Sequence, residues 1–153
     1  MREETIRRAC RRCGERARVD FLPIGLDAEA SGDVRVYATV NVDGSSGVAI
    51  SEDGNPAGYG CCRPAADPPA LHVGALLSHS LIPVAYPDTW AGWTGAGTSA
   101  VSLLYSDGST GPAVSGGGYF LAIDHAPPGA HPVALIARAA DGRELDRIAI
   151  SRG

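Results

Sequence analysis

The last third of the chain alternates short strand-forming runs with tight-turn residues, and this rhythm constrains the fold more than any other feature. We predict strands over residues 100–105, 112–115, 119–124, 132–139 and 144–151. The segments between them contain Asp107-Gly108, Gly116-Gly117-Gly118 and Asp141-Gly142, which are residues that tight hairpin turns prefer. Short strands with turns about every 8 to 12 residues predict an antiparallel β-sandwich or barrel.

A similar pattern occurs once in the first third. Apolar side chains alternate with more polar ones over residues 34–41, which predicts a half-buried strand. Asp43-Gly44 follows, and residues 48–51 are expected to return as the second strand of a hairpin.

The middle of the chain is harder to interpret. Residues 71–77 and 81–85 are short apolar runs, for which we expect one or two strands, with a helix over 71–80 as the alternative. Residues 53–69 and 87–98 are rich in Pro, Gly or both, and we predict loops there.

The N-terminal segment has a helical period. Apolar side chains over residues 3–17 recur at spacings of three and four, namely Ile6, Ala9, Cys10, Cys13 and Ala17. We therefore expect an Arg-rich amphipathic helix over residues 1–18, followed by a single β-sandwich domain over residues 19–153. The predicted fold class is mainly β, an antiparallel Ig-like β-sandwich with an N-terminal amphipathic helix.

Charge is unevenly distributed along the chain. Residues 1–18 hold seven Arg and three Glu, whereas the remainder holds six Arg and fourteen acidic residues. Arg7, Arg8, Arg11 and Arg12 are therefore the candidate contacts to an acidic protein partner or to nucleic acid. We favour a protein partner, because the remainder lacks the basic and aromatic pattern of a nucleic-acid surface. The simpler interpretation, which we favour over binding of either partner, is that the helix packs against its own acidic body or stays solvated.

The four cysteines are Cys10, Cys13, Cys61 and Cys62. Cys10 and Cys13 have the C-x2-C spacing of half a zinc site, but adjacent cysteines make a poor second half because neighbouring side chains diverge. We expect buried cysteines, with a disulfide or a metal site as alternatives. We find neither a secretory signal nor the apolar run of about 18 residues that a membrane span needs. We therefore expect no membrane span and favour the cytoplasm.

The familiar catalytic motifs are missing. The sequence contains no G-x-S-x-G, no P-loop, no dinucleotide fingerprint and no H-E-x-x-H. We therefore expect no enzymatic activity and no cofactor. A metal-dependent hydrolase that uses His72 or His79 is a weaker alternative.

One aromatic group is the candidate ligand site. Tyr86, Trp90 and Trp93 lie in or beside the second predicted loop, where exposed rings would suit a sugar or a protein. The alternative, which we favour, is that both Trp fill one end of the sandwich, because the chain has only two Phe to supply large core side chains.

Three hairpin motifs in the C-terminal part also carry a family resemblance. They are VSLLYSDGS at residues 101–109, GYFLA at 118–122 and VALIARAADGREL at 133–145. Over about residues 99–150 the chain resembles the Ig-like or carboxypeptidase-regulatory-like β-sandwich modules of uncharacterised actinobacterial proteins. The resemblance implies a non-catalytic module, and such modules often follow a membrane anchor or signal sequence. The expected function is a non-catalytic binding or structural module.

Overall fold

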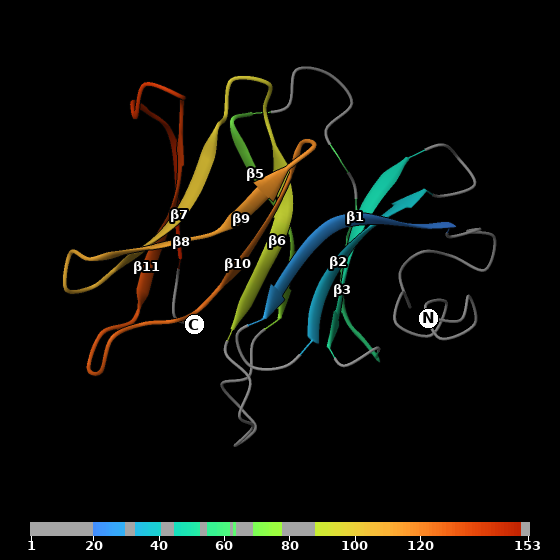
Figure 1. Cartoon of the computed structure of the whole chain (residues 1–153), viewed down its shortest axis with the longest axis horizontal. Coiled ribbons are helices and arrows are strands. Elements are labelled where there is room, and N and C mark those ends of the chain that lie inside the picture. Colours follow the sequence, from blue (N-terminus) through green and yellow to red (C-terminus); the bar gives the residue numbers. More distant parts are fainter. Residues whose placement is uncertain are drawn as a thin grey trace.

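The computed structural model describes residues 20–29, 33–40, 45–52, 55–61, 63, 69–77 and 88–150 (Figure 1). These residues form twelve β-strands and no helix, and the strands pair antiparallel throughout. The mainly β, antiparallel class is therefore confirmed. The predicted N-terminal helix and the predicted strand at 81–85 lie outside the described residues.

The strands form three four-stranded sheets, which we call sheets A, B and C. Sheet A is a meander of β1 (Asp20–Glu29), β2 (Asp33–Val40), β3 (Ser46–Glu52) and β4 (Asn55–Cys61). Sheet B has the order β5 (Leu71–Leu77), β6 (Thr89–Thr94), β10 (Tyr119–Ile123) and β9 (Val114–Gly116). Sheet C has the order β12 (Glu144–Ala149), β11 (Pro132–Arg138), β7 (Ala100–Tyr105) and β8 (Thr110–Pro112).

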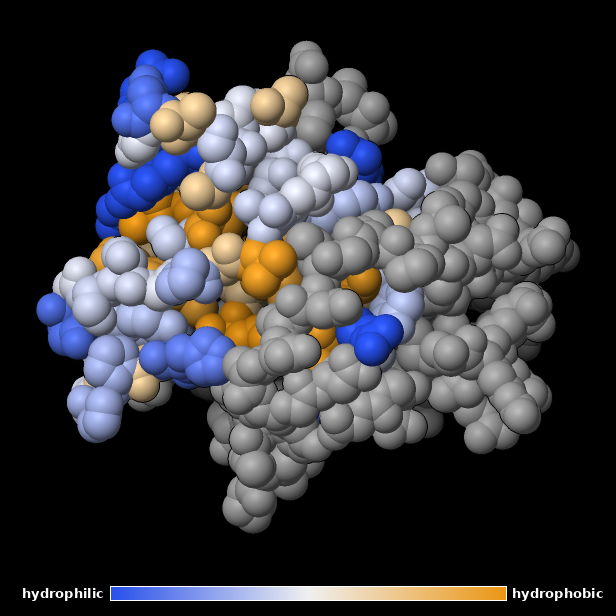
Figure 2. Space-filling view, viewed as in Figure 1, coloured by the Kyte–Doolittle hydropathy of each residue, from blue (hydrophilic) through white to orange (hydrophobic). Residues whose placement is uncertain are grey.

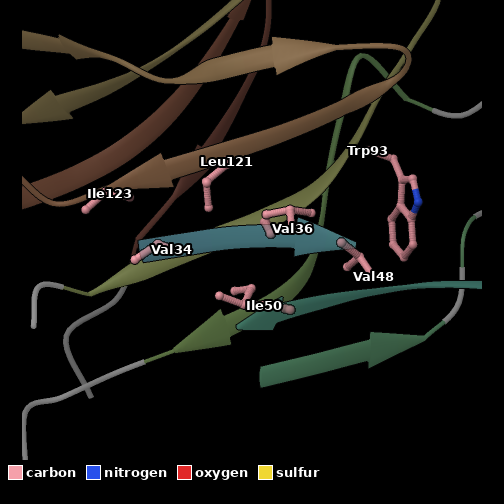
Figure 3. Close-up of a cluster of buried hydrophobic side chains, with 9 residues drawn as sticks. Val34, Val36, Val48, Ile50, Trp93, Leu121 and Ile123 are labelled. Atoms are coloured by element: carbon pink, nitrogen blue, oxygen red, sulfur yellow. The ribbon is translucent and has the colours of Figure 1, made fainter. Parts of the chain in front are cut away.

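Sheet B is the middle layer of three. On β10, Leu121 and Ile123 belong to a buried cluster with residues of sheet A, among them Val36 (Figure 3). Phe120 and Ala122 of the same strand belong to a second cluster with residues of sheet C. Successive residues of a strand point to opposite faces, so both faces of sheet B are buried. The expected face-to-face packing of antiparallel sheets is present, and the structure adds a third layer to it.

The view in Figure 1 places sheet A to the right, sheet B in the centre and sheet C to the left. In the same view of the surface, the orange hydrophobic residues of the described part show in its left and central region, between more hydrophilic residues above and below (Figure 2). Burial between layers is thus the main source of stability in this fold, because apolar area removed from water contributes about 25 cal/mol per Å².

The predicted loop over residues 87–98 is wrong for its first half, which forms β6. All six residues of β6 are buried, so no polar face reveals the strand by alternation. Gly92 also has a structural reason to lack a side chain, because a Cβ there would overlap the carbonyl oxygen of His72 on β5. The sequence pattern therefore predicts a loop for residues that form β6, an inner strand of sheet B.

The predicted loop over residues 53–69 is also partly wrong, because residues 55–61 form β4. Pro56 lacks a backbone N–H, and it is tolerated because β4 is an edge strand of sheet A. The opposite edge strand, β1, contains Pro23 and an irregular register between Pro23 and Asp27. We had assigned no strand to that segment.

The predicted strand over residues 112–115 is two strands in the structure. Thr110–Pro112 is β8 of sheet C and Val114–Gly116 is β9 of sheet B, so the chain crosses from one layer to the next at Ala113. The predicted turns of the last third are confirmed, since Gly108, Gly118 and Gly142 all have φ of 85°. The predicted turn at Asp43-Gly44 lies outside the described residues.

Candidate functional site

A pocket of about 350 Å³ opens beside the turn between β9 and β10. Its walls come from the segment that follows β6 (residues 94–96 and 98–99), from β9 and its turn (residues 115–118), and from Arg63, which follows β4. The pocket therefore lies where the end of sheet B meets the chain that leaves sheet A.

Hydrogen bonds hold these walls in place. The amide of Thr94 donates to the carbonyl of Gly118 over 2.9 Å, and the amide of Gly95 donates to the carbonyl of Ala70 over 3.2 Å. The Thr98 hydroxyl donates to the same Ala70 carbonyl over 2.8 Å. The walls are therefore tied to one another before any ligand arrives.

Arg63 is exposed, and it is the one charged residue among the described residues that line the pocket. Its amide donates to the carbonyl of Ser46 over 2.8 Å, which anchors its backbone to sheet A. A Cβ built on Gly118 would lie 3.6 Å from Arg63 Nη2. The guanidinium therefore lies against the turn at Gly118, where the absence of a side chain leaves space for it. Within the described part of the chain, no carboxylate forms an ion pair with Arg63.

Hydroxyl groups supply most of the remaining polar lining. Thr94, Thr98, Ser99 and Ser115 each contribute one to the wall. Thr94 is only 6% exposed, and among the described residues none hydrogen-bonds to its hydroxyl. Among the described lining residues there is no His, Cys, Asp, Glu or aromatic side chain. Such a wall can hold a small polar anion, and it offers no general base of the usual kinds.

The aromatic residues singled out from the sequence do not form a surface site in the structure. Trp90 is 5% exposed and Trp93 is fully buried. Trp90 packs in the cluster between sheets B and C, and Trp93 packs in the cluster between sheets A and B. Both indoles are therefore core side chains within a sheet, rather than exposed rings or the end of a sandwich. Tyr86 lies outside the described residues.

The other candidates lie mostly outside the described residues as well, namely Arg7, Arg8, Arg11, Arg12, Cys10, Cys13, Cys62 and His79. Cys61 ends β4, and only its backbone is described. His72 is half-buried on β5 and its ring centroid lies 5.5 Å from that of Trp93. Among the described residues, no group of three or more His, Cys, Asp or Glu could hold a metal ion.

Sequence reasoning missed the pocket altogether. Gly116-Gly117-Gly118 was correctly predicted as a turn, but nothing in the sequence connects that turn to Arg63 or to Thr94. The only sequence signal for the pocket is Arg63 itself, a basic residue in the predicted loop over residues 53–69.

Comparison with known proteins adds no relative. No family model, no curated protein and no solved structure matches this chain. Within the described residues, no helix has the length and hydropathy needed to cross a membrane.

Proposed function

We propose that this protein is a non-catalytic binding module that holds a small polar ligand in the pocket beside the β9–β10 turn. The observation that carries the proposal is the pocket itself. Its volume of about 350 Å³ falls within the range of small-molecule sites, and Arg63 enters it without a described carboxylate partner. A charged side chain that faces a pocket without a counter-ion favours a ligand of opposite charge.

The placement of the pocket supports the same proposal. The residues that line it come from connecting segments and from an edge strand, and they are held by a scaffold whose middle layer is buried on both faces. Rigid sheets that present short loops are a common arrangement for binding sites.

The chemistry of the lining supports a binding role over a catalytic one. Arginine, hydroxyls and glycine backbone orient and hold a ligand, whereas general acid–base catalysis usually needs a His, a carboxylate or another titratable group near the operating pH. The resemblance of residues 99–150 to Ig-like or carboxypeptidase-regulatory-like modules agrees with this role, because such modules are commonly non-catalytic. We therefore also propose that residues 99–150 belong to this family of β-sandwich modules.

Ligand-observed NMR on the full chain tests the proposal. The panel consists of neutral monosaccharides, hexuronates, amino acids and dipeptides, and each compound is examined for saturation transfer from the protein. We expect transfer to at least one compound. Ser115→Phe on β9 should abolish that transfer by filling the pocket, whereas Thr110→Phe, at an exposed position on the neighbouring strand β8, should preserve it.

Three outcomes contradict the proposal. Transfer that persists in Ser115→Phe places the ligand elsewhere, and a complete absence of transfer removes the binding role. Chemical conversion of a bound compound during a day of incubation shows an enzyme. Far-ultraviolet circular dichroism of both variants establishes that the strands still form.

A further inference from the structure

We infer that the ligand carries a carboxylate that pairs with Arg63, so that the pocket takes a small, hydroxylated, monoanionic acid of the hexuronate type. The inference names the ligand class of the pocket and rests on the function proposed above.

The charge of the pocket favours a single negative charge on the ligand. Arg63 supplies one positive charge, and no other lining residue within the described part of the chain is charged. A phosphate dianion would therefore keep one charge uncompensated. The chain has a formal net charge of −4, and residues 19–153 hold fourteen acidic residues against six Arg. A monoanion is therefore matched, while a dianion meets an unfavourable field from the rest of the molecule.

The geometry of arginine suits a carboxylate. The planar guanidinium presents parallel N–H groups that match the oxygens of a carboxylate or of a phosphate in a bidentate pair, so the charge argument above decides between these two groups. Arg63 Nη2 lies against Gly118, whose φ of 85° belongs to the left-handed region and suits a residue without a side chain. The tight turn thus leaves room for the guanidinium at the pocket wall.

The other polar groups favour a hydroxylated body. Thr94 adjoins the same turn, because its amide donates to the Gly118 carbonyl over 2.9 Å. Thr98, Ser99 and Ser115 line the rest of the pocket. The Thr98 hydroxyl already donates to the Ala70 carbonyl and can only accept from a ligand. A free Ser or Thr hydroxyl can both donate and accept, so this wall pairs with ligand hydroxyls more readily than with an apolar surface. A ligand with a carboxylate and several hydroxyls satisfies both parts of the lining.

Isothermal titration calorimetry of the full chain tests this inference with four named probes: D-glucuronate, D-glucose, inorganic phosphate and sulfate. We expect glucuronate to bind most tightly. Glucose should bind at least about tenfold more weakly, because a hydrogen bond to a charged group contributes more than one between neutral groups.

Two variants separate the role of Arg63 from general charge. Arg63→Gln should weaken glucuronate binding about tenfold or more, since the ligand loses the one cationic partner that the described lining residues offer. Arg147→Gln on β12 removes the same charge from an exposed site whose side chain pairs with Glu144 over 2.7 Å. That control should change the affinity by less than about twofold, because an exposed surface charge acts weakly at a distance.

The outcomes distinguish this inference from the proposed function. Equal binding of glucose and glucuronate, or an unchanged glucuronate affinity in Arg63→Gln, contradicts the inference that the ligand carries a carboxylate. The proposed binding function is unaffected by either result. Tighter binding of phosphate or sulfate than of glucuronate overturns the monoanion. If none of the four probes binds but another panel compound enters the pocket, the hexuronate class is wrong and the binding role survives. If no compound enters the pocket, both fail.

Discussion

The Tyr105 side chain joins two parts of the chain that lie far apart in sequence. It ends β7, it is 3% exposed, and its hydroxyl accepts a hydrogen bond from the His125 amide over 3.1 Å. Burial raises the pKa of Tyr105 above its ordinary value of 10.0, and the carboxylate of Asp124 raises the pKa further. The His125 amide opposes this shift, because it favours the charged phenolate.

We predict that Tyr105→Phe lowers the free energy of unfolding at pH 7 by about 0.5 to 1.5 kcal/mol, because the His125 amide loses its acceptor. Since the folded-state pKa is raised, the stability that the neutral phenol contributes is fully present below pH 10 and is lost as the pH rises through the folded-state pKa. Urea unfolding at pH 7 and at about pH 11 measures both effects. The parent protein should lose more stability between these pH values than Tyr105→Phe does, and an equal loss contradicts this role.

At the scale of elements, β4 and β5 approach each other so closely that glycine is required. These are edge strands of sheets A and B, and a Cβ on Gly60 of β4 would overlap the carbonyl of Gly74 on β5. Gly58 on the same strand is different, because a Cβ there would meet the nearest atom of Ile50 at 3.8 Å, an ordinary contact.

Gly60→Ala should therefore lower the free energy of unfolding by about 1 to 3 kcal/mol, since the backbone of one strand must move to make room. Gly58→Ala provides a matched control and should change it by about 0.5 kcal/mol or less. Chemical unfolding of the two variants side by side provides the measurement. Similar losses in both would show that the approach of β4 to β5 is not close enough to require glycine.

Strands that an alternating pattern or neighbouring tight-turn residues mark could be predicted from the sequence, whereas three other strands were missed. The alternation over 34–41 corresponds to β2, and the turn residues located β7, β10, β11 and β12 to within two residues of their ends. β6 was missed because both of its faces are buried, which removes the alternation on which the prediction depends. β4 was missed because edge strands tolerate Pro, whereas Pro in residues 53–69 predicts a loop. No element was predicted over β1.

The pocket could not be predicted because its residues meet only through the topology. Arg63 follows sheet A, whereas Thr94 and Gly118 belong to the end of sheet B. Hydrophobic periodicity and sequence motifs relate residues that are close in sequence, whereas Arg63, Thr94 and Gly118 are far apart in sequence. The favoured expectation that Trp90 and Trp93 are core side chains is confirmed, but nothing in the sequence indicates the middle layer that buries both.

For the molecule as a whole, the middle layer makes the two hydrophobic clusters depend on one another. Phe120 and Leu121 are adjacent on β10 and belong to opposite clusters, and both are buried. Loss of either side chain therefore weakens the packing on one face of sheet B, and sheet B is the partner of both outer sheets.

We predict that Phe120→Ala lowers the free energy of unfolding by about 3 to 5 kcal/mol and Leu121→Ala by about 2 to 5 kcal/mol. Each variant should unfold in a single transition in which far- and near-ultraviolet circular dichroism coincide, because the layers form one cooperative unit. Val114→Ala, at a partly exposed position on β9, is the control and should have a small effect. Two separate transitions would contradict the expectation of a single β domain over residues 19–153.

The passage of one short segment through two layers has a mechanical consequence. Within residues 110–116, the part before Ala113 pairs with β7 and the part after it pairs with β10. Ser115 and Gly116, in the second part, line the pocket. A displacement of sheet C would therefore be transmitted along the backbone to the pocket. A partner bound to sheet C would change the shape of the pocket, and a ligand in the pocket would oppose that displacement.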